Sequence, residues 1–441
     1  MHLFPLRLWL VALVISFAVA QPARAVSLIR DAEIENALAE LSAPILRAAG
    51  LSPQQVRILV VDDRSLNAFV INGTAIFIHT GLLLKLESAA QLQSVIAHEA
   101  AHISNGHITR RLTNIRGARN TAAFGMVLAA AVAMSTGRGD AAAGIAAGVA
   151  GSSQRNLFAH TRSEESAADQ SGTRYMLRAG ADPAAALEVL EIFRGQEALS
   201  VGRQDPYAST HPLTNDRMRA LRGLVAANPG TPTDQSTATY WFARAQGKLS
   251  AFTQNPSWTL GRTSDDTSAI AQMRRAVAYH RQPDAGRAIA TMEALLAANP
   301  NDAYLHELLG QILLESRQAA AAVDAYWRAV NLAPNEPLIL GGYGRALLAV
   351  NTADSNRRAV EALQRARDSD PLDGRILRDL GLAYSRAGQN GLASLATAER
   401  YALAGRMDDA ALHAARAADQ LPRGSTPWQR AQDVLSATQT R

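Results

Sequence analysis

The sequence predicts a mainly α-helical chain in two parts, an α+β domain with a small sheet followed by an α-solenoid. Three observations support this fold class. Residues 88–98 lack Pro and Gly, are rich in Ala, Leu and Gln, and lead into two histidines four residues apart. Residues 67–81 alternate as strand, turn and strand, with Asn72-Gly73 at the turn. From residue 268 onward, helical segments end in regularly spaced prolines.

The first 25 residues are expected to be a signal peptide. Arg7 precedes an apolar run from Trp9 to Ala20, and the small residues of Ala23-Arg24-Ala25 predict cleavage after Ala25. An uncleaved anchor is the alternative, although the run of 12 is shorter than the roughly 20 residues that span a bilayer. The absence of cysteine excludes disulfides and a lipidated cysteine. We therefore expect a soluble periplasmic protein.

The pattern His98-Glu99-Ala100-Ala101-His102 indicates a metal site. Two histidines four residues apart on a helix project from one face and can bind one metal ion, with the Glu99 carboxylate beside them. A catalytic zinc site has three protein ligands and an open position for a water, which Glu99 would deprotonate for attack on a peptide carbonyl. The alternative is a surface helix with two solvated histidines.

The third ligand is expected from a later helix. A metzincin would need Gly at position 105 and His at position 108, where this chain has Asn105 and Ile108, so His107 is interpreted as a bystander. Glu165 and Asp169 lie one helical turn apart, so one carboxylate can bind the metal while the other orients a histidine ligand. The alternative is an acidic helix start that the helix dipole favours.

With these residues the chain resembles the prenyl-protease-like gluzincins, zincin-like metallopeptidases with an HExxH motif followed by ExEAD. Ala167 stands where the family has its second Glu, at a position that does not bind the metal. The resemblance implies one Zn²⁺ per chain, with the roles divided among five residues: His98, His102 and Glu165 as ligands, Glu99 as the catalytic base, and Asp169 as an orienting or proton-donating residue.

Two further segments agree with this resemblance. The strand pair that contains Asn67, Phe69 and Gly73 resembles the family's strand beside the cleft, where an extended substrate would add as another strand. His211-Pro212, with Arg217 six residues after the histidine, resembles the loop that follows the zinc helices. The resemblance implies a regulatory His211 that displaces the catalytic water as a fourth ligand, whereas the alternative is ordinary turn chemistry.

Residues 122–151 allow two interpretations. The apolar stretch 122–134 has thirteen residues, too few to span a membrane, and the segment 141–151 is almost all Ala and Gly. One interpretation is a helical hairpin packed inside the peptidase domain. The other, which the resemblance suggests, is a lid or a peripheral membrane contact over the cleft.

The C-terminal part is predicted to contain tetratricopeptide repeats. Pro300, Pro334, Pro371 and Pro422 are 34, 37 and 51 residues apart, and a period near 34 is typical of this repeat. We expect an extra helix in the longest interval, around residues 392–404. The expected division of the chain is as follows: a signal peptide (1–25), a zinc metallopeptidase domain (26–227), a linker with a connecting helix (228–267) and a tetratricopeptide-repeat domain (268–441).

The sequence favours an exported zinc endopeptidase with a helical-repeat arm. A net charge of +5 and the lack of a basic run interleaved with aromatics argue against nucleic-acid binding. The resemblance implies that the substrates are unfolded, stalled or misassembled outer-membrane proteins, and that the repeats bind them or the outer-membrane barrel assembly complex. The alternatives are a chaperone-like assembly adaptor whose peptidase site is largely shut, and a general scavenging protease.

Overall fold

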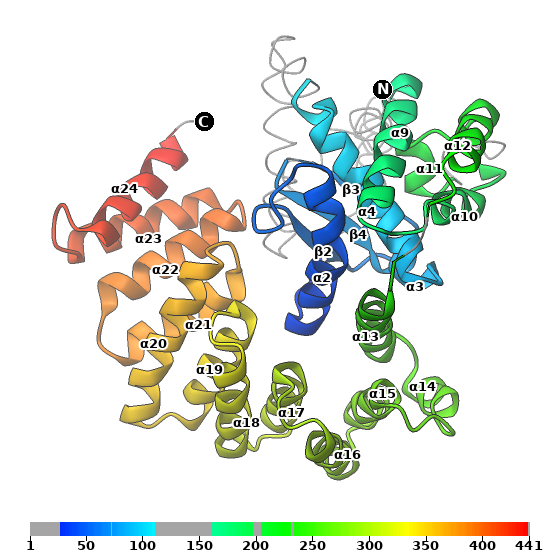
Figure 1. The fold of residues 1–441 in the computed structure, drawn as a ribbon. Coiled ribbons are helices and arrows are strands. Elements are labelled where there is room, and N and C mark those ends of the chain that lie inside the picture. Colours follow the sequence, from blue (N-terminus) through cyan, green and yellow to red (C-terminus); the bar gives the residue numbers. More distant parts are fainter. Residues whose placement is uncertain (1–26, 72, 111–160, 197–203, 231–232, 440–441) are drawn as a thin grey trace, which may run out of the picture.

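The computed structural model describes residues 27–71, 73–110, 161–196, 204–230 and 233–439. The expected signal peptide, the turn residue Asn72 and the segment 122–151 lie outside these residues. No helix in the described part of the chain is both long and apolar enough to span a bilayer. The predicted fold class is confirmed, because a small sheet with covering helices precedes a series of paired helices (Figure 1).

A four-stranded sheet forms the centre of the N-terminal part. Its strands are β1 (Leu28–Ile29), β2 (Arg57–Val61), β3 (Ala68–Val70) and β4 (Ala75–His79). The spatial order is β1-β2-β4-β3, in which β2 and β4 run parallel and the other neighbours antiparallel. The predicted strand pair at 67–81 therefore corresponds to β3 and β4, and β3 is an edge of the sheet.

Helices cover this sheet, and two of them carry the candidate metal site. The covering helices are α2 (Ala32–Ala48), α3 (Thr80–Lys85), α4 (Ala89–Ser104), α9 (Arg162–Arg178), α10 (Ala185–Ile192), α11 (Pro206–Thr210) and α12 (Asn215–Ala227). The Ser88 side chain caps the start of α4 by accepting from Gln91 N, and Thr161 and Glu164 form a capping box on α9. Both helices therefore begin at residues whose side chains satisfy free backbone N–H groups.

Helices α4 and α9 pack closely at a glycine. A Cβ atom added to Gly172 of α9 would lie 3.4 Å from the backbone of Ala97 in α4, so any side chain there would press on the helix that carries the histidines. Apolar residues of α4, among them Leu92, Val95 and Ile96, are fully buried in the core of this part. His98 and His102 of the same helix are buried beside these apolar residues.

The C-terminal part is an array of helices joined to the first by α13 (Ser236–Thr253) and α14 (Pro256–Arg262). The array comprises α15 (Ala269–Arg281), α16 (Ala285–Ala298), α17 (Ala303–Glu315), α18 (Ala319–Leu332), α19 (Pro337–Val350), α20 (Ala353–Ser369), α21 (Gly374–Arg386), α22 (Asn390–Leu403), α23 (Met407–Gln420) and α24 (Thr426–Gln439). Figure 1 shows these helices as an arc with α2 on its inner side. The expected extra helix corresponds to α22.

Small residues allow the repeat helices to approach one another. A Cβ atom on Gly310 would lie 2.6 Å from the ring of Tyr326, and one on Gly342 would lie 2.4 Å from the same ring. Tyr326 of α18 is thus wedged between α17 and α19. These positions match the pattern of small and aromatic residues that the repeat predicts.

Buried ion pairs join the two parts. Lys248 of α13 lies 2.9 Å from Asp31 and 3.2 Å from Glu33 at the start of α2, and 3.5 Å from Glu307 of α17. Arg30 forms a second cluster, with a 2.5 Å contact to Asp370 in the repeats. Because these charges are buried and mutually paired, they hold the repeats at a defined place on the peptidase domain.

Candidate metal centre

Four predicted site residues meet in one buried group. His98 and His102 come from α4, Glu165 from α9 and His211 from the end of α11, and one potential ligand atom from each lies within 4.8 Å of the others. All four residues are buried. The structure thus brings together segments that are up to 113 residues apart in the sequence.

Helix geometry accounts for the pairing of the two α4 histidines. Their Nε2 atoms are 3.1 Å apart because residues four apart share one face of a helix. The Glu165 carboxylate reaches both, with Oε2 lying 3.4 Å from His98 Nε2 and Oε1 lying 3.3 Å from His102 Nε2. This arrangement matches a carboxylate ligand contributed by a second helix.

Asp169 contacts the other ring nitrogen of His98. Its Oδ1 lies 3.1 Å from His98 Nδ1, the position from which a carboxylate fixes the tautomer of a metal-binding histidine. Arg217 of α12 donates to Asp169 from Nε at 2.6 Å and from Nη2 at 2.9 Å, and its Nη1 lies 2.6 Å from Glu165 Oε2. One buried guanidinium therefore bridges the two carboxylates, a role that the sequence pattern did not predict.

His107 was interpreted as a bystander, and it is not part of the four-residue group. It nevertheless contacts one member of that group, because its Nδ1 lies 2.9 Å from His102 Nδ1 and its side chain is buried. Both α4 histidines consequently have a partner on the ring nitrogen that faces away from the cluster.

His211 lies inside the cluster. Its Nδ1 is 3.0 Å from Glu165 Oε1, its Nε2 is 3.4 Å from Glu99 Oε1, and its ring stacks on Tyr207 at a centroid distance of 4.5 Å. The residue also ends α11, where its N–H donates to the carbonyl of Tyr207. The imidazole of His211 is only 2% exposed and lies next to His98, Glu99 and Glu165. A role in the turn alone would not require these contacts.

Burial and neighbouring charges shift the pKa values of these groups in opposite directions. Burial raises the pKa of Glu99, although the nearby charges of His211 and His98 oppose this. Burial also opposes ionisation of Glu165, but the charges of His211 and Arg217 hold its pKa well below the usual range. For His98, burial lowers the pKa, and the charge of Glu165 together with Asp169 raises it to about 9.

The donor set fits a divalent cation. Three imidazoles and one ionised carboxylate are typical ligands of zinc and related metals. Among the described residues, neither carboxylate oxygen of Glu99 has a hydrogen-bond partner, although both are buried. A buried carboxylate without hydrogen bonds is costly, and a metal-bound water beside it would satisfy it.

The predicted substrate-edge strand lies next to α4. Asn67 is buried immediately before β3, and no described residue donates a hydrogen bond to its side-chain oxygen. Phe69 of β3 stacks on Phe77 of β4 with ring centroids 5.3 Å apart. A Cβ atom on Gly73 would lie 3.8 Å from the side chain of Ile103 in α4. In the described part of the chain, the β3 edge of the sheet therefore runs beside the helix that carries the histidines.

Comparison with known proteins agrees with this geometry. Residues 29–225 match the model of peptidase family M48. These residues make up somewhat less than half of the chain, and the match supports a metallopeptidase of this family there. The matched residues include every member of the cluster, so the family match and the buried donor group together support a metalloprotease with a metal-binding site at this place.

The similarity extends beyond the M48 domain. The chain is 26% identical to the beta-barrel assembly-enhancing protease of Escherichia coli (strain K12) over 408 residues, which are 90% of this chain and 81% of that protein. The mitochondrial metalloendopeptidase OMA1 of Schizosaccharomyces pombe is 28% identical over 177 residues, 40% of this chain and 49% of that protein. A crystal structure of MamA, 20% identical, covers 37% of this chain and 91% of its own, with a TM-score of 0.30.

Proposed function

We propose that this protein is a periplasmic zinc endopeptidase that degrades misfolded or stalled outer-membrane proteins and assists the assembly of outer-membrane β-barrels. The observation that carries the activity is the buried group of three histidines and Glu165 with the Glu99 carboxylate beside it. The similarity to a beta-barrel assembly-enhancing protease over 90% of the chain supports the class of substrate. The expected signal peptide, cleaved after Ala25, supports the compartment.

In this proposal His98, His102 and Glu165 hold the zinc ion. When bound, zinc supplies a Lewis acid for the peptide carbonyl and lowers the pKa of its water. Glu99, whose buried carboxylate lies beside the cluster, would act as the base that takes a proton from water. Asp169 keeps His98 in the tautomer whose Nε2 faces the cluster.

The remaining residues of the site position these groups and the substrate. Arg217 offsets the charge of the two carboxylates that it bridges, so that both remain ionised inside the protein. An extended substrate would add to the edge strand β3, beside Asn67 and Phe69, and present its backbone to α4.

His211 is proposed to regulate the enzyme. Four protein ligands close the coordination of zinc, so an imidazole in the fourth position would exclude the catalytic water. The contacts of His211 with Glu165 and Glu99 are compatible with this role. Movement of His211 away from the cluster would then open the site.

The repeats are proposed to bind substrates or the outer-membrane barrel assembly complex. Stacked helical repeats form extended concave surfaces that suit such partners, and Figure 1 shows the inner side of the arc turned toward the peptidase domain. Membrane contact by residues 122–151 remains an expectation from the sequence.

The test is the cleavage of an unfolded outer-membrane protein by purified residues 26–441, with zinc quantified. Glu99→Gln should abolish cleavage and retain zinc, whereas the exposed Glu87→Gln should behave like the wild type. His211→Ala should retain zinc and cleave faster than the wild type. If no form cleaves despite bound zinc and bound substrate, the endopeptidase proposal is wrong and an assembly adaptor is the better description.

A further inference from the structure

The backbone of the β3 segment points alternately toward β4 and toward the edge of the sheet. The Asn67 carbonyl accepts a hydrogen bond from His79 N at 2.9 Å, which fixes the side that faces β4. Because neighbouring residues of a strand direct their N–H and C=O groups to opposite sides, those of Leu66, Ala68 and Val70 point away from β4. In the described part of the chain, no strand pairs with β3 on that side.

The Leu66 position on this edge is already taken by the start of α11. The Leu66 carbonyl accepts a hydrogen bond from Tyr207 N at 3.2 Å, and the Leu66 N–H donates to Asp205 Oδ1 at 3.5 Å. Successive edge positions are about 7 Å apart, the rise of two residues in a strand. A strand that pairs with Val70 and Ala68 and continues for two more residues would therefore meet Tyr207.

Tyr207 is linked to His211 in two ways. His211 N donates to the Tyr207 carbonyl at 2.8 Å, and the two rings stack with their centroids 4.5 Å apart and their planes at 27°. The Tyr207 ring also stacks on Phe193, at a centroid distance of 4.6 Å. The histidine in the metal group thus depends on the same residue that bonds to Leu66, and a shift of Tyr207 would carry the imidazole with it.

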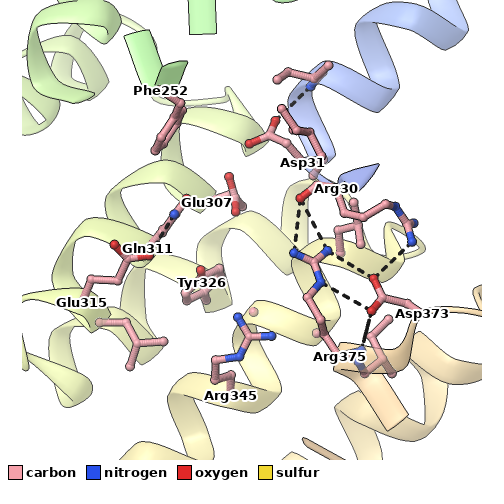
Figure 2. Close-up of a pocket in the computed structure, with 18 of the residues that line it drawn as sticks. Arg30, Asp31, Phe252, Glu307, Gln311, Glu315, Tyr326, Arg345, Asp373 and Arg375 are labelled. Carbon is pink, nitrogen blue, oxygen red and sulfur yellow. Dashed lines mark hydrogen bonds and ion pairs between the residues drawn. The ribbon is translucent and has the colours of Figure 1, made fainter. Parts of the chain in front are cut away.

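The strand side of this contact is held more firmly than α11. The Asp63 carbonyl, three residues before Leu66, accepts a hydrogen bond from Gly81 N at 3.0 Å. The sheet is also joined to the repeats, because Arg30, directly after β1, lies 3.2 Å from Asp373, as Figure 2 shows. Helix α11 has only five residues, and short segments rearrange at low cost. A competing strand would therefore displace α11 and leave Leu66 in place.

We propose that Leu66 is a substrate-binding position, and that a substrate strand long enough to pair with it displaces Tyr207 and withdraws His211 from the metal group. This inference rests on the proposed function, in which the substrate adds to β3 and His211 shuts the site. The substrate backbone donates its own N–H to the Leu66 carbonyl, so a hydrogen bond is exchanged and not lost. The enzyme then selects extended segments by length. An unfolded membrane β-strand of about 9–11 residues would meet this requirement.

The first test measures the movement of α11 without requiring cleavage. Hydrogen exchange of backbone amides is followed by mass spectrometry in the Glu99→Gln protein, with and without a saturating unfolded outer-membrane protein. Exchange should become slower in residues 66–71, where the substrate pairs, and about tenfold faster in residues 204–211. Helix α10, which packs against α4, is the control and should exchange at an unchanged rate. The proposal requires both changes, so the absence of either one overturns it.

The second test measures the length that a substrate needs. Peptides with one shared cleavage sequence are lengthened by two residues at a time, at either end. In the wild type, kcat/KM should rise about tenfold at one step and at one end only, because only one end of the added strand reaches Leu66. Tyr207→Leu keeps the N–H but removes the ring that stacks on His211, so it should cleave the shorter peptides faster and lose the step.

Two controls accompany this test. Tyr207→Phe retains a stacking ring and should keep the step, as should Tyr401→Leu, which makes the same change on repeat helix α22. A step that persists in Tyr207→Leu would show that length acts through ordinary binding contacts, and it would contradict the proposal. If neither the wild type nor Tyr207→Leu cleaves any substrate, the proposed function fails, and the exchange rates still decide whether a bound polypeptide moves α11.

Discussion

Replacement of Lys248 by Met should strongly destabilise the junction between the two parts of the protein. The ammonium group is fully buried and lies within 3.5 Å of three carboxylates, those of Asp31, Glu33 and Glu307. Met fills a similar volume but removes the ammonium that Asp31 and Glu307 share, while Glu33 keeps only Arg244 as a buried cation. Removal of one partner from a buried ion pair costs about 3–5 kcal/mol, and we expect a loss of that size in the free energy of unfolding.

Urea denaturation followed by circular dichroism and tryptophan fluorescence measures this loss. The exposed Lys85→Met provides the matched control and should change the free energy of unfolding by about 0.5 kcal/mol or less. The substituted protein should unfold at a lower urea concentration, beginning with the separation of the repeats from the peptidase domain. A loss below about 1 kcal/mol for Lys248→Met would refute the reasoning, because it would show that the carboxylates need no buried counter-charge.

Three further predictions concern single side chains. Burial raises the pKa of Glu307 to about 7, so the folded protein binds this proton more tightly than the unfolded chain does. The free energy of unfolding should therefore fall as the pH rises from about 4.5 toward 7. Urea denaturation at several pH values should show this decline in the wild type but not in Glu307→Gln. Arg217→Met should weaken zinc binding about 10–100-fold in chelator competition, whereas the exposed Arg219→Met should not. His107→Ala should weaken zinc binding about tenfold, and His107→Asn, which can still accept a hydrogen bond from His102, should restore part of it.

The sequence predicted the parts of the site that follow from short-range spacing. The two histidines of α4 share a face because four residues make about one turn, and the same rule places Glu165 and Asp169 together on α9. The proline period also predicted the repeat helices, because each repeat unit recurs at a nearly fixed interval along the chain.

Contacts that depend on tertiary packing could not be predicted in this way. Arg217 is one basic residue on a polar helix, and only the packing of α12 against α9 places it between two carboxylates. No pattern of neighbouring residues predicts the ion pairs of Lys248 either. Its partner Asp31 lies near the start of the described chain, and its partner Glu307 lies in a repeat helix. A buried lysine contradicts the usual exposure of its residue type, so composition predicts it at the surface.

The four donors of the cluster differ in how firmly the fold holds them, and we propose that this difference determines which one can leave. His98, His102 and Glu165 stand on two long helices that pack at Gly172. His211 follows the five-residue helix α11, and its ring is held by stacking and by charge contacts with the cluster itself. Displacing an α4 histidine or Glu165 would require a long, buried helix to move, whereas His211 needs only a rearrangement of a short segment. The same three donors remain after that rearrangement, and three protein ligands with one free position is the arrangement that catalysis by zinc requires.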